Sequence, residues 1–373
     1  MAEYRSARPE ERNEYIDLAN YAFGADFETL LPKVYGKGID SSSLQMVAVD
    51  EQGRMRALVA VLPERLNVCD HKLQTGYLGT VSVHPRARGE GHMKVLMNSW
   101  LERLSEEAYD MIVLAGQRQR YEYFGFTLGG ARVKHTVTQD NIRHALKDTN
   151  AEGISFCPLF EAEGAVALAQ RLNTSRLAHV ERAAQILPQI MKTFNLNPLG
   201  VLEAGRLIGY LLVNKEGNEI SELALEHPDQ IVRTIKAYMA NQEVWRVTVN
   251  SPDYDKALNA QLGELAEECV IETSDMYNIL DFANVVEAYL TLKHRSTGLV
   301  AGEFSAVMDG QPVTARVDEH GVTVERTAKP DAVTLSKQQA QKLLLTQHSR
   351  YMEVGAPAGW FPLPLFWYKT DKF

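Results

Sequence analysis

The sequence has few of the features that mark secreted, metal-binding or membrane-spanning proteins. Its three cysteines, Cys69, Cys157 and Cys269, are far apart, with no CxxC pair and no Cys/His cluster. This spacing disfavours a disulfide scaffold or a structural zinc site, so we expect no metal and three buried, unreactive thiols. No apolar run approaches the roughly 20 residues of a membrane-spanning helix. The N-terminus is charged from its third residue, unlike a secretory signal, so a cytoplasmic location is expected.

Positive charge is also in short supply. The 39 Lys and Arg residues face 48 Asp and Glu residues, which gives a formal net charge of −9 at pH 7. Nucleic-acid-binding domains are commonly basic, so we expect no nucleic-acid partner, and no membrane partner either. An acidic surface attracts cationic small molecules where the charge is focused in a cleft. At roughly 100–200 residues per domain, a chain of 373 residues predicts two or three domains.

The first third of the chain alternates between strand and helix patterns. Apolar residues recur at helical spacing in two segments, and short apolar runs bounded by turn residues lie between them. The strands are expected at 43–50, 56–68, 78–85 and 109–116, and the helices at 9–23 and 93–104. This order predicts a mixed α/β unit of about one domain.

Two further blocks follow. The pattern turns polar near HALKDTNAEGISF, and the next block repeats the order hairpin, strand, helix, but with HPDQI where the first block has a glycine-rich loop. A meander of short strands with DG and HG turns then precedes the helix KQQAQKLLL. We therefore predict domains at 1–145, 146–273 and 274–373. The chain ends in GWFPLPLFWYKTDKF, which is too apolar to remain in water and is expected to dock.

The stretch between the strand at 78–85 and the helix at 93–104 carries the clearest chemical signal. Gly89 and Gly91 lie there among positive charges, and a glycine-rich turn at a helix N-terminus offers bare backbone N–H groups to a phosphate. The Walker loop needs GK[ST], and the dinucleotide fingerprint needs a glycine where Lys94 stands. Two interpretations of the stretch remain. It is either a loop of the pattern R-x-x-G-x-G, made by Arg86, Gly89 and Gly91, or a glycine turn that binds no ligand.

This pattern resembles the pyrophosphate loop of the GNAT acetyltransferases. The flanking strand, the helix and the segment RYEYFGFTLGG, which looks like the family's Y-x-x-F-G-F, follow that family's order. The whole chain resembles the enhanced-intracellular-survival (Eis) type. The resemblance implies two tandem GNAT-type domains, the second degenerate, and a sterol-carrier-like α/β domain with the tail. It also implies an acetyl-CoA-dependent N-acetyltransferase acting on an aminoglycoside, polyamine or lysine-like amine, and a homo-hexamer built as a trimer of dimers or a dimer of trimers.

The resemblance also assigns residues to acetyl-CoA. Strand backbone would bond the pantetheine arm, the loop and helix start would hold the diphosphate, and two residues after the fifth strand would complete the site. These cofactor-binding residues are Val81, Ser82, Val83, Arg88, Gly89, Glu90, Gly91, His92, Met93, Lys94, Gly116 and Gln117. The Glu90 side chain is expected to point away from the phosphates, and Arg86 is either a further contact or a solvated charge.

Acyl transfer needs a proton donor for the thiolate and an acceptor for the amine proton. By resemblance, Tyr121 is the general acid, with Tyr123 as its rival, and the α-carboxylate of Phe373 is the general base. Such a carboxyl group has a pKa of roughly 3.3–3.7 and is ionised at neutral pH. The alternative is that the tail merely packs on its own domain. His84 is expected to be structural or to contact the cofactor.

Three points stay open. Asp26 and Glu28 correspond loosely to an acidic substrate rim, or are a solvated charge pair. The third domain could instead make the protein a lipid-binding carrier with vestigial transferase activity. The protein could also be an acyl-CoA sensor without turnover.

Overall fold

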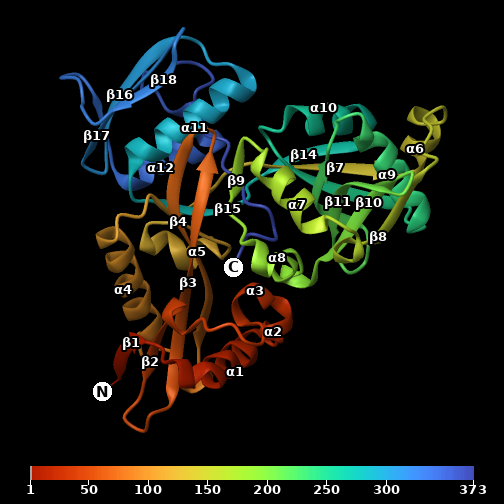
Figure 1. Cartoon of the computed structure of the whole chain (residues 1–373). Helices are drawn as coiled ribbons and strands as arrows, with labels where there is room; N and C mark the ends of the chain where they lie inside the picture. The colour runs from red at the N-terminus through yellow and green to blue at the C-terminus, as the bar shows by residue number, and fades with distance from the viewer. Residues whose placement is uncertain (1) are drawn as a thin grey trace.

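The computed structural model describes residues 2–373, which form three β-sheets with their covering helices (Figure 1). The first sheet has the strand order β1-β2-β3-β4-β5-β15-β6, with β9 paired to β3. The second has the order β14-β7-β13-β12-β11-β10-β8, and the third has β18-β17-β16-β19. The mixed α/β fold expected from the sequence is confirmed.

The first unit contains the elements predicted for the first third of the chain. Its long β3–β4 hairpin rises from this unit to the third one, and the predicted strand at 78–85 is only the end of β4 (Figure 1). The strands are β1 (Glu3–Ser6), β2 (Gln45–Val49), β3 (Met55–Val68), β4 (His71–Val83), β5 (Met111–Leu114), β6 (Thr127–Gly129) and β9 (Ala178–Val180). The helices are α1 (Arg12–Phe23), α2 (Phe27–Leu30), α3 (Pro32–Tyr35), α4 (His92–Glu106) and α5 (Arg118–Tyr121).

The second unit repeats this topology. Read from β8, its order β8-β10-β11-β12-β13-β7-β14 matches β1-β2-β3-β4-β5-β15-β6 strand for strand. The strands are β7 (Arg132–Thr138), β8 (Ile154–Pro158), β10 (Asn197–Glu203), β11 (Arg206–Val213), β12 (Glu219–Leu225), β13 (Arg246–Pro252) and β14 (Glu268–Glu272). The helices are α6 (Gln139–Ala145), α7 (Ala165–Thr174), α8 (Leu187–Met191), α9 (Gln230–Asn241) and α10 (Lys256–Leu265).

The two units exchange strands. After β6 the chain crosses to the second sheet, where β7 pairs antiparallel with β13 and β14. After the second sheet it returns as β15 (Asp275–Ile279), which pairs antiparallel with β5 and β6. Sheet membership therefore changes at 132 and again at 275, and between these points β9 also joins the first sheet through β3. The domain division at 145/146 and 273/274 stays a prediction.

The third unit is a four-stranded sheet covered by two helices. Its DG hairpin has positive φ at both turn residues, Asp309 (51°) and Gly310 (79°), as a type I′ turn requires. The strands are β16 (Gly302–Met308), β17 (Gln311–Asp318), β18 (Gly321–Glu325) and β19 (Val333–Leu335), and the helices are α11 (Phe282–Thr297) and α12 (Lys337–Leu345). In Figure 1, α11 lies between this sheet and the far end of the β3–β4 hairpin.

The aromatic chain end is docked, as the sequence predicted. Trp360, Leu365 and Trp367 are buried, and they belong to one continuous apolar core that also includes residues of the first and third units. Two tail carbonyls, those of Trp360 and Pro362, accept hydrogen bonds from the Lys293 ammonium. The C-terminus consequently lies at the centre of the molecule, between the first and second units (Figure 1). No helix among residues 2–373 is long and apolar enough to cross a membrane.

Truncating the tail anchor should destabilise the protein. Trp360 is fully buried and its indole N–H donates to the carbonyl of Val300 at 3.0 Å. Trp360→Ala is expected to lower the free energy of unfolding by about 3–5 kcal/mol, since a large cavity forms and the hydrogen bond to Val300 is lost. Urea unfolding followed by circular dichroism measures this. Tyr351→Ala, at a side chain 80% exposed, is the control and should change it by less than about 0.5 kcal/mol.

Candidate active site

A cleft opens in the first sheet where β4 and β5 separate. The two parallel strands pair from Thr75–Met111 to Tyr77–Val113, but β4 continues to Val83. Between the diverging ends lies a cavity of about 480 Å³. One wall comes from β4 and the other from the segment after β5. Its lining includes Val81, Val83, Arg88, Met93, Gly116, Gln117, Arg120 and Tyr121.

The glycine loop continues this cleft to the N-terminus of α4. Gly89 and Gly91 have φ of 87° and 83°, values that side-chain-bearing residues rarely adopt, and a Cβ on either would meet nothing within 4 Å. Within residues 2–373 no side chain caps α4. A second cavity of about 440 Å³ lies here and shares Val83, Arg88 and Met93 with the first. The loop thus exposes uncapped backbone to open space.

Two of the sequence-predicted loop residues are engaged with each other. The Nε2–H of His92 donates to the Glu90 carboxylate at 3.0 Å, and the Tyr4 hydroxyl donates to Nδ1 at 2.9 Å. His92 is buried, so these bonds fix its ring at the start of the helix. Lys94 lies with Nζ 5.3 Å from the ring centroid of Tyr123 and lines the second cavity.

Tyr121 lies in the cleft and Tyr123 does not reach the same wall. The Tyr121 ring packs so closely on Gly116 that a Cβ there would be 2.3 Å from Cε2, and it meets Phe126 edge to face at 6.3 Å. Burial raises the pKa of the Tyr121 hydroxyl, which keeps it protonated at neutral pH. Tyr123 is 69% exposed and lines only the loop cavity. The geometry therefore distinguishes between two tyrosines that the sequence left open.

The chain end packs directly on β4, next to this cleft. A Cβ on Gly79 would be 2.8 Å from the main-chain carbon of Phe373, so only glycine admits the terminal residue there. Thr80 has φ of 50°, and the register shifts from Ala60–Gly79 to Leu58–Ser82, which marks a bulge in β4. Gly79 precedes Val81 by two residues, or about 7 Å along a strand. The Phe373 carboxylate therefore lies near the strand segment that lines the cleft.

Aromatic packing holds the last residue from the other side. The Phe373 ring lies 6.1 Å from that of Tyr35, whose hydroxyl donates to Thr80 Oγ1 at 2.9 Å. Within residues 2–373 no side chain forms an ion pair with the terminal carboxylate at 4.0 Å or less. The terminal carboxylate is thus positioned by packing.

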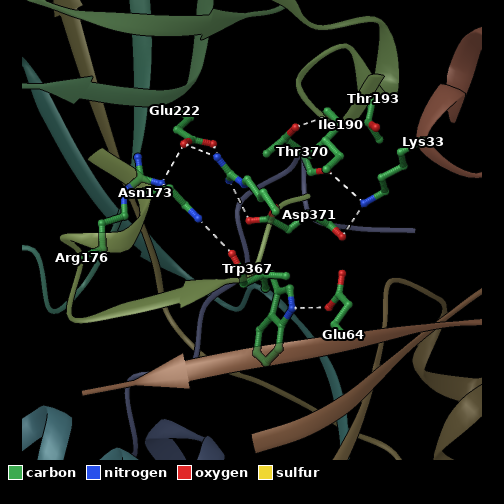
Figure 2. Close-up of polar contacts among 12 residues, drawn as sticks. Lys33, Glu64, Asn173, Arg176, Ile190, Thr193, Glu222, Trp367, Thr370 and Asp371 are labelled. Carbon is green, nitrogen blue, oxygen red and sulfur yellow. Dashed lines mark hydrogen bonds and ion pairs between the residues drawn. The ribbon is translucent and has the colours of Figure 1, made fainter. Parts of the chain in front are cut away.

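Buried charges fix the segment just before the chain end (Figure 2). Asp371 receives two hydrogen bonds from Arg182, at 2.7 and 2.8 Å, and the same guanidinium donates twice to Glu222 at 2.9 Å. Lys33 donates to the backbone carbonyls of Thr370 and Asp371, at 3.0 and 2.6 Å. The tail is therefore tied to α3 of the first unit, to the loop after β9, and to β12 of the second unit.

These interactions shift the protonation of the buried groups. Burial alone would raise the pKa of Glu222, but Arg182 and Arg176 lower it to about 2. Burial raises the pKa of Glu64, which accepts a hydrogen bond from the Trp367 indole at 2.9 Å, and lowers the pKa of Lys33. Glu222 is consequently ionised at neutral pH, while Glu64 is held toward its neutral form.

Three polar residues that the sequence left with open functions, His84, Asp26 and Glu28, have structural contacts. His84 accepts from the backbone N–H of Arg86 and stacks on Tyr21 at 5.8 Å, so it caps the short 3₁₀ turn that follows β4. Asp26 caps α2, and Glu28 pairs with Arg12 at 2.9 Å. The carboxylates of Asp26 and Glu28 thus interact with groups of the protein itself.

The cysteine prediction needs a correction. All three thiols are free, but Cys69 and Cys157 are half-buried and Cys269 is exposed on edge strand β14, where no packing layer covers it. No group of three His, Cys, Asp or Glu residues within residues 2–373 could hold a metal ion.

Sequence reasoning did not single out Gly79, Arg182 or Asp371. A glycine inside the strand pattern YLGTVSV could have signalled a close backbone approach. The lone acid in the last turn of an apolar tail could have signalled a buried partner. Nothing in the sequence connects Arg182 to it, since 189 positions separate the two residues.

The first unit has a recognised family. Residues 3–129 match the model of the acetyltransferase (GNAT) domain, and no curated protein matches the chain. This segment ends at β6, so it contains the loop, the cleft and Tyr121.

Solved structures share the whole architecture at low identity. A protein from Enterococcus faecalis V583 described as a probable N-acyltransferase has a TM-score of 0.69 at 16% identity, over 94% of this chain and 92% of its own. A GCN5-related N-acetyltransferase from Anabaena variabilis has 0.65 at 17%, over 91% and 88%. Eis1 from Mycobacterium abscessus has 0.60 at 13%, over 90% and 87%. At these identities the likeness establishes the fold.

The family match assigns the class of the first unit. This unit is a GNAT acetyltransferase domain, and the second unit has the same strand order without the glycine loop. The chain therefore carries an acetyltransferase domain of the GNAT class.

The charge cluster behind the tail should make stability depend on pH. The pKa of Glu222 in the folded state, about 2, lies below its ordinary value of 4.5, so its contribution is present above pH 4.5 and is lost as pH falls toward 2. That contribution is about 3 kcal/mol, at roughly 1.4 kcal/mol per pKa unit. In urea titrations between pH 5 and pH 3, Glu222→Gln should show a shallower loss of stability than the wild type. The exposed Glu161→Gln should keep the wild-type slope; parallel curves for Glu222→Gln and wild type would contradict the assignment.

Proposed function

We propose that the protein is an acetyl-CoA-dependent N-acetyltransferase of the Eis type, which transfers an acetyl group directly to a primary amine. The observation that carries this proposal is the meeting of three features on β4: the open cleft, the bare glycine loop and the buried chain end. The likeness to Eis1 and to the N-acyltransferase fold over nearly the whole chain supports it.

In this proposal acetyl-CoA lies along the joined cavities. The backbone of Val81, Ser82 and Val83 bonds the pantetheine arm like an added strand, because β5 has turned away from that edge. Uncapped amides at residues 88–94 hold the diphosphate, aided by the helix dipole. Gly116 and Gln117 form the opposite wall. GNAT enzymes use acetyl-CoA as co-substrate, and the reaction needs no metal.

The reaction is the attack of the amine nitrogen on the thioester carbonyl. The Phe373 carboxylate accepts the amine proton, directly or through a water molecule, while the C–N bond forms. As the C–S bond breaks, the Tyr121 hydroxyl donates its proton to the CoA thiolate. Burial of Tyr121 raises its pKa, so the proton is present at neutral pH when the thiolate develops beside it. The proton taken up by the Phe373 carboxylate then returns to Tyr121 through solvent, so both groups are restored and the products are the amide and the CoA thiol.

The other units complete this arrangement. The second unit holds Asp371 through Arg182, and the third, sterol-carrier-like by resemblance, anchors the aromatic tail. The acceptor is an aminoglycoside, a polyamine or a lysine-like amine, by the same resemblance. A cytoplasmic homo-hexamer is part of the proposal on the same ground. A thiol-release assay with acetyl-CoA against a panel of such amines tests the activity, and no turnover with any of them counts against it.

The glycine loop can be tested by a matched pair of substitutions. Gly91→Ala strains a positive φ at the start of α4, and the relaxed loop should move its amides away from the diphosphate. Calorimetry should show acetyl-CoA binding weakened about tenfold, or roughly 1.4 kcal/mol. Gly53→Ala introduces the same strain at φ of 76°, in open space on the β2–β3 turn, and should leave affinity unchanged. Equal affinities in both variants would reject the loop as the diphosphate site.

The two proton-transfer groups can be tested separately from cofactor binding. Extending the chain by one residue after Phe373, or Gly79→Ala, should displace the terminal carboxylate, because the space beside Gly79 is already filled. Tyr121→Phe removes only the hydroxyl. Each change should lower kcat by about 10²–10⁴-fold, the usual range for an acid or base, with acetyl-CoA affinity retained.

The control for these changes is Tyr123→Phe, which should keep turnover because its ring lies outside the cleft wall. Full activity in a protein with a C-terminal extension would rule out the carboxylate as base. Full activity in Tyr121→Phe would assign the acid to another group.

A further inference from the structure

The second unit has a cavity at the place where the first unit has its cleft. Its parallel strands β12 and β13 pair only at Glu219–Thr248 and Ile220–Val249, and β12 then runs on to Leu225. In the matching strand order, β12 corresponds to β4 and β13 to β5. A cavity of about 420 Å³ lies beyond the point where the pairs end. This volume falls in the usual range for small-molecule sites, roughly 300–1,000 Å³.

This cavity is not built for a diphosphate. The loop between β12 and α9 is residues 226–229, against residues 84–91 between β4 and α4, and it contains Pro228 and no glycine. Backbone amides are therefore not presented on a flexible turn as they are in the first unit. A coenzyme A nucleotide has no counterpart of its loop here, so the occupant is a different molecule.

Apolar side chains make up the larger part of the cavity lining, and they come from several parts of the chain. Leu223 and Leu225 come from β12, Ile231 from α9, and Tyr254 from the segment after β13. The tail supplies Tyr368, whose ring lies 4.3 Å from the guanidinium carbon of Arg176. An unbranched apolar chain would bury its surface against these side chains.

The charges around the cavity are mostly neutralised by partners within the protein. Four charged lining residues have such partners: Glu226 with Arg171 and Arg206, Arg176 with Glu222, Arg295 with Asp70, and Asp255 with the first turn of α10. Lys256 and His227 are different. Both are exposed lining residues, and neither side chain has a hydrogen bond or ion pair within residues 2–373. Among the charged and histidine side chains that line the cavity, the two without such a partner are thus a cation and an imidazole.

From this arrangement we propose that the second unit binds a medium-chain aliphatic carboxylate. The carboxylate pairs with Lys256 and His227 at the mouth, and the chain lies between the leucines of β12 and the rings of Tyr254 and Tyr368. This site is separate from the acetyl-CoA cleft, so the proposal does not rest on the function proposed above.

The test is calorimetry of the full-length protein with decanoate, compared with decylammonium, which has the same chain and the opposite charge. One decanoate per chain should bind, at least tenfold more tightly than decylammonium. Excess acetyl-CoA should leave decanoate binding unchanged. No decanoate binding, equal binding of both probes, or displacement by acetyl-CoA would overturn the proposal, the last because it places the chain in the first cleft.

Two pairs of variants locate the site. Ala257→Trp puts a large ring at an exposed lining position and should weaken decanoate binding at least tenfold, whereas Ala260→Trp, exposed on the same helix outside the cavity, should not. Lys256→Glu should weaken it about tenfold, whereas Lys215→Glu, exposed elsewhere on the same unit, should not. Circular dichroism confirms that all four variants fold. Undiminished binding in either Ala257→Trp or Lys256→Glu would refute the assignment.

Discussion

One buried guanidinium joins the parts of this protein. Arg182 donates to Glu222 of the second sheet and to Asp371 of the tail, and all three side chains are almost inaccessible to solvent. Burying such charges costs desolvation energy that their attraction only partly offsets, so the cluster is weak evidence for added stability. Its consequence is positional: an alternative tail conformation would leave a buried charge unpaired. Phe373 is thereby fixed against Gly79, which lies two residues before the β4 segment that lines the cleft.

The strand exchange gives that cluster a rigid frame. Because β7 completes the second sheet and β15 completes the first, neither sheet is complete without chain from beyond its own block. The ladder between β9 and β3 adds a further link, and relative motion of the sheets would break backbone hydrogen bonds in these ladders. The exchange also brings Asp275, at the start of β15, to the Lys372 ammonium, at 2.7 and 2.9 Å. The tail is therefore held from three units that cannot easily separate.

Much of the candidate site was predictable because its chemistry is local. Gly89 and Gly91 stand between a strand pattern and a helical one, and their positive φ values and open surroundings match that expectation. Apolar periodicity placed α4 and β5 within a few residues. The start of β4 was missed because HKLQTGY alternates weakly. The pairing of β15 with β5 was not predicted, because an apolar run does not say which sheet it joins.

By itself the sequence determined the α/β class, the duplicated order of elements, the glycine turn before α4 and the burial of an aromatic chain end. These depend on residue type and spacing along a few consecutive turns. The tertiary structure decided which tyrosine lines the cleft, that Gly79 admits Phe373, and that Arg182 meets Asp371 across 189 positions. Such contacts depend on how distant segments pack, and packing is set by the whole core and by strand pairing rather than by any local pattern.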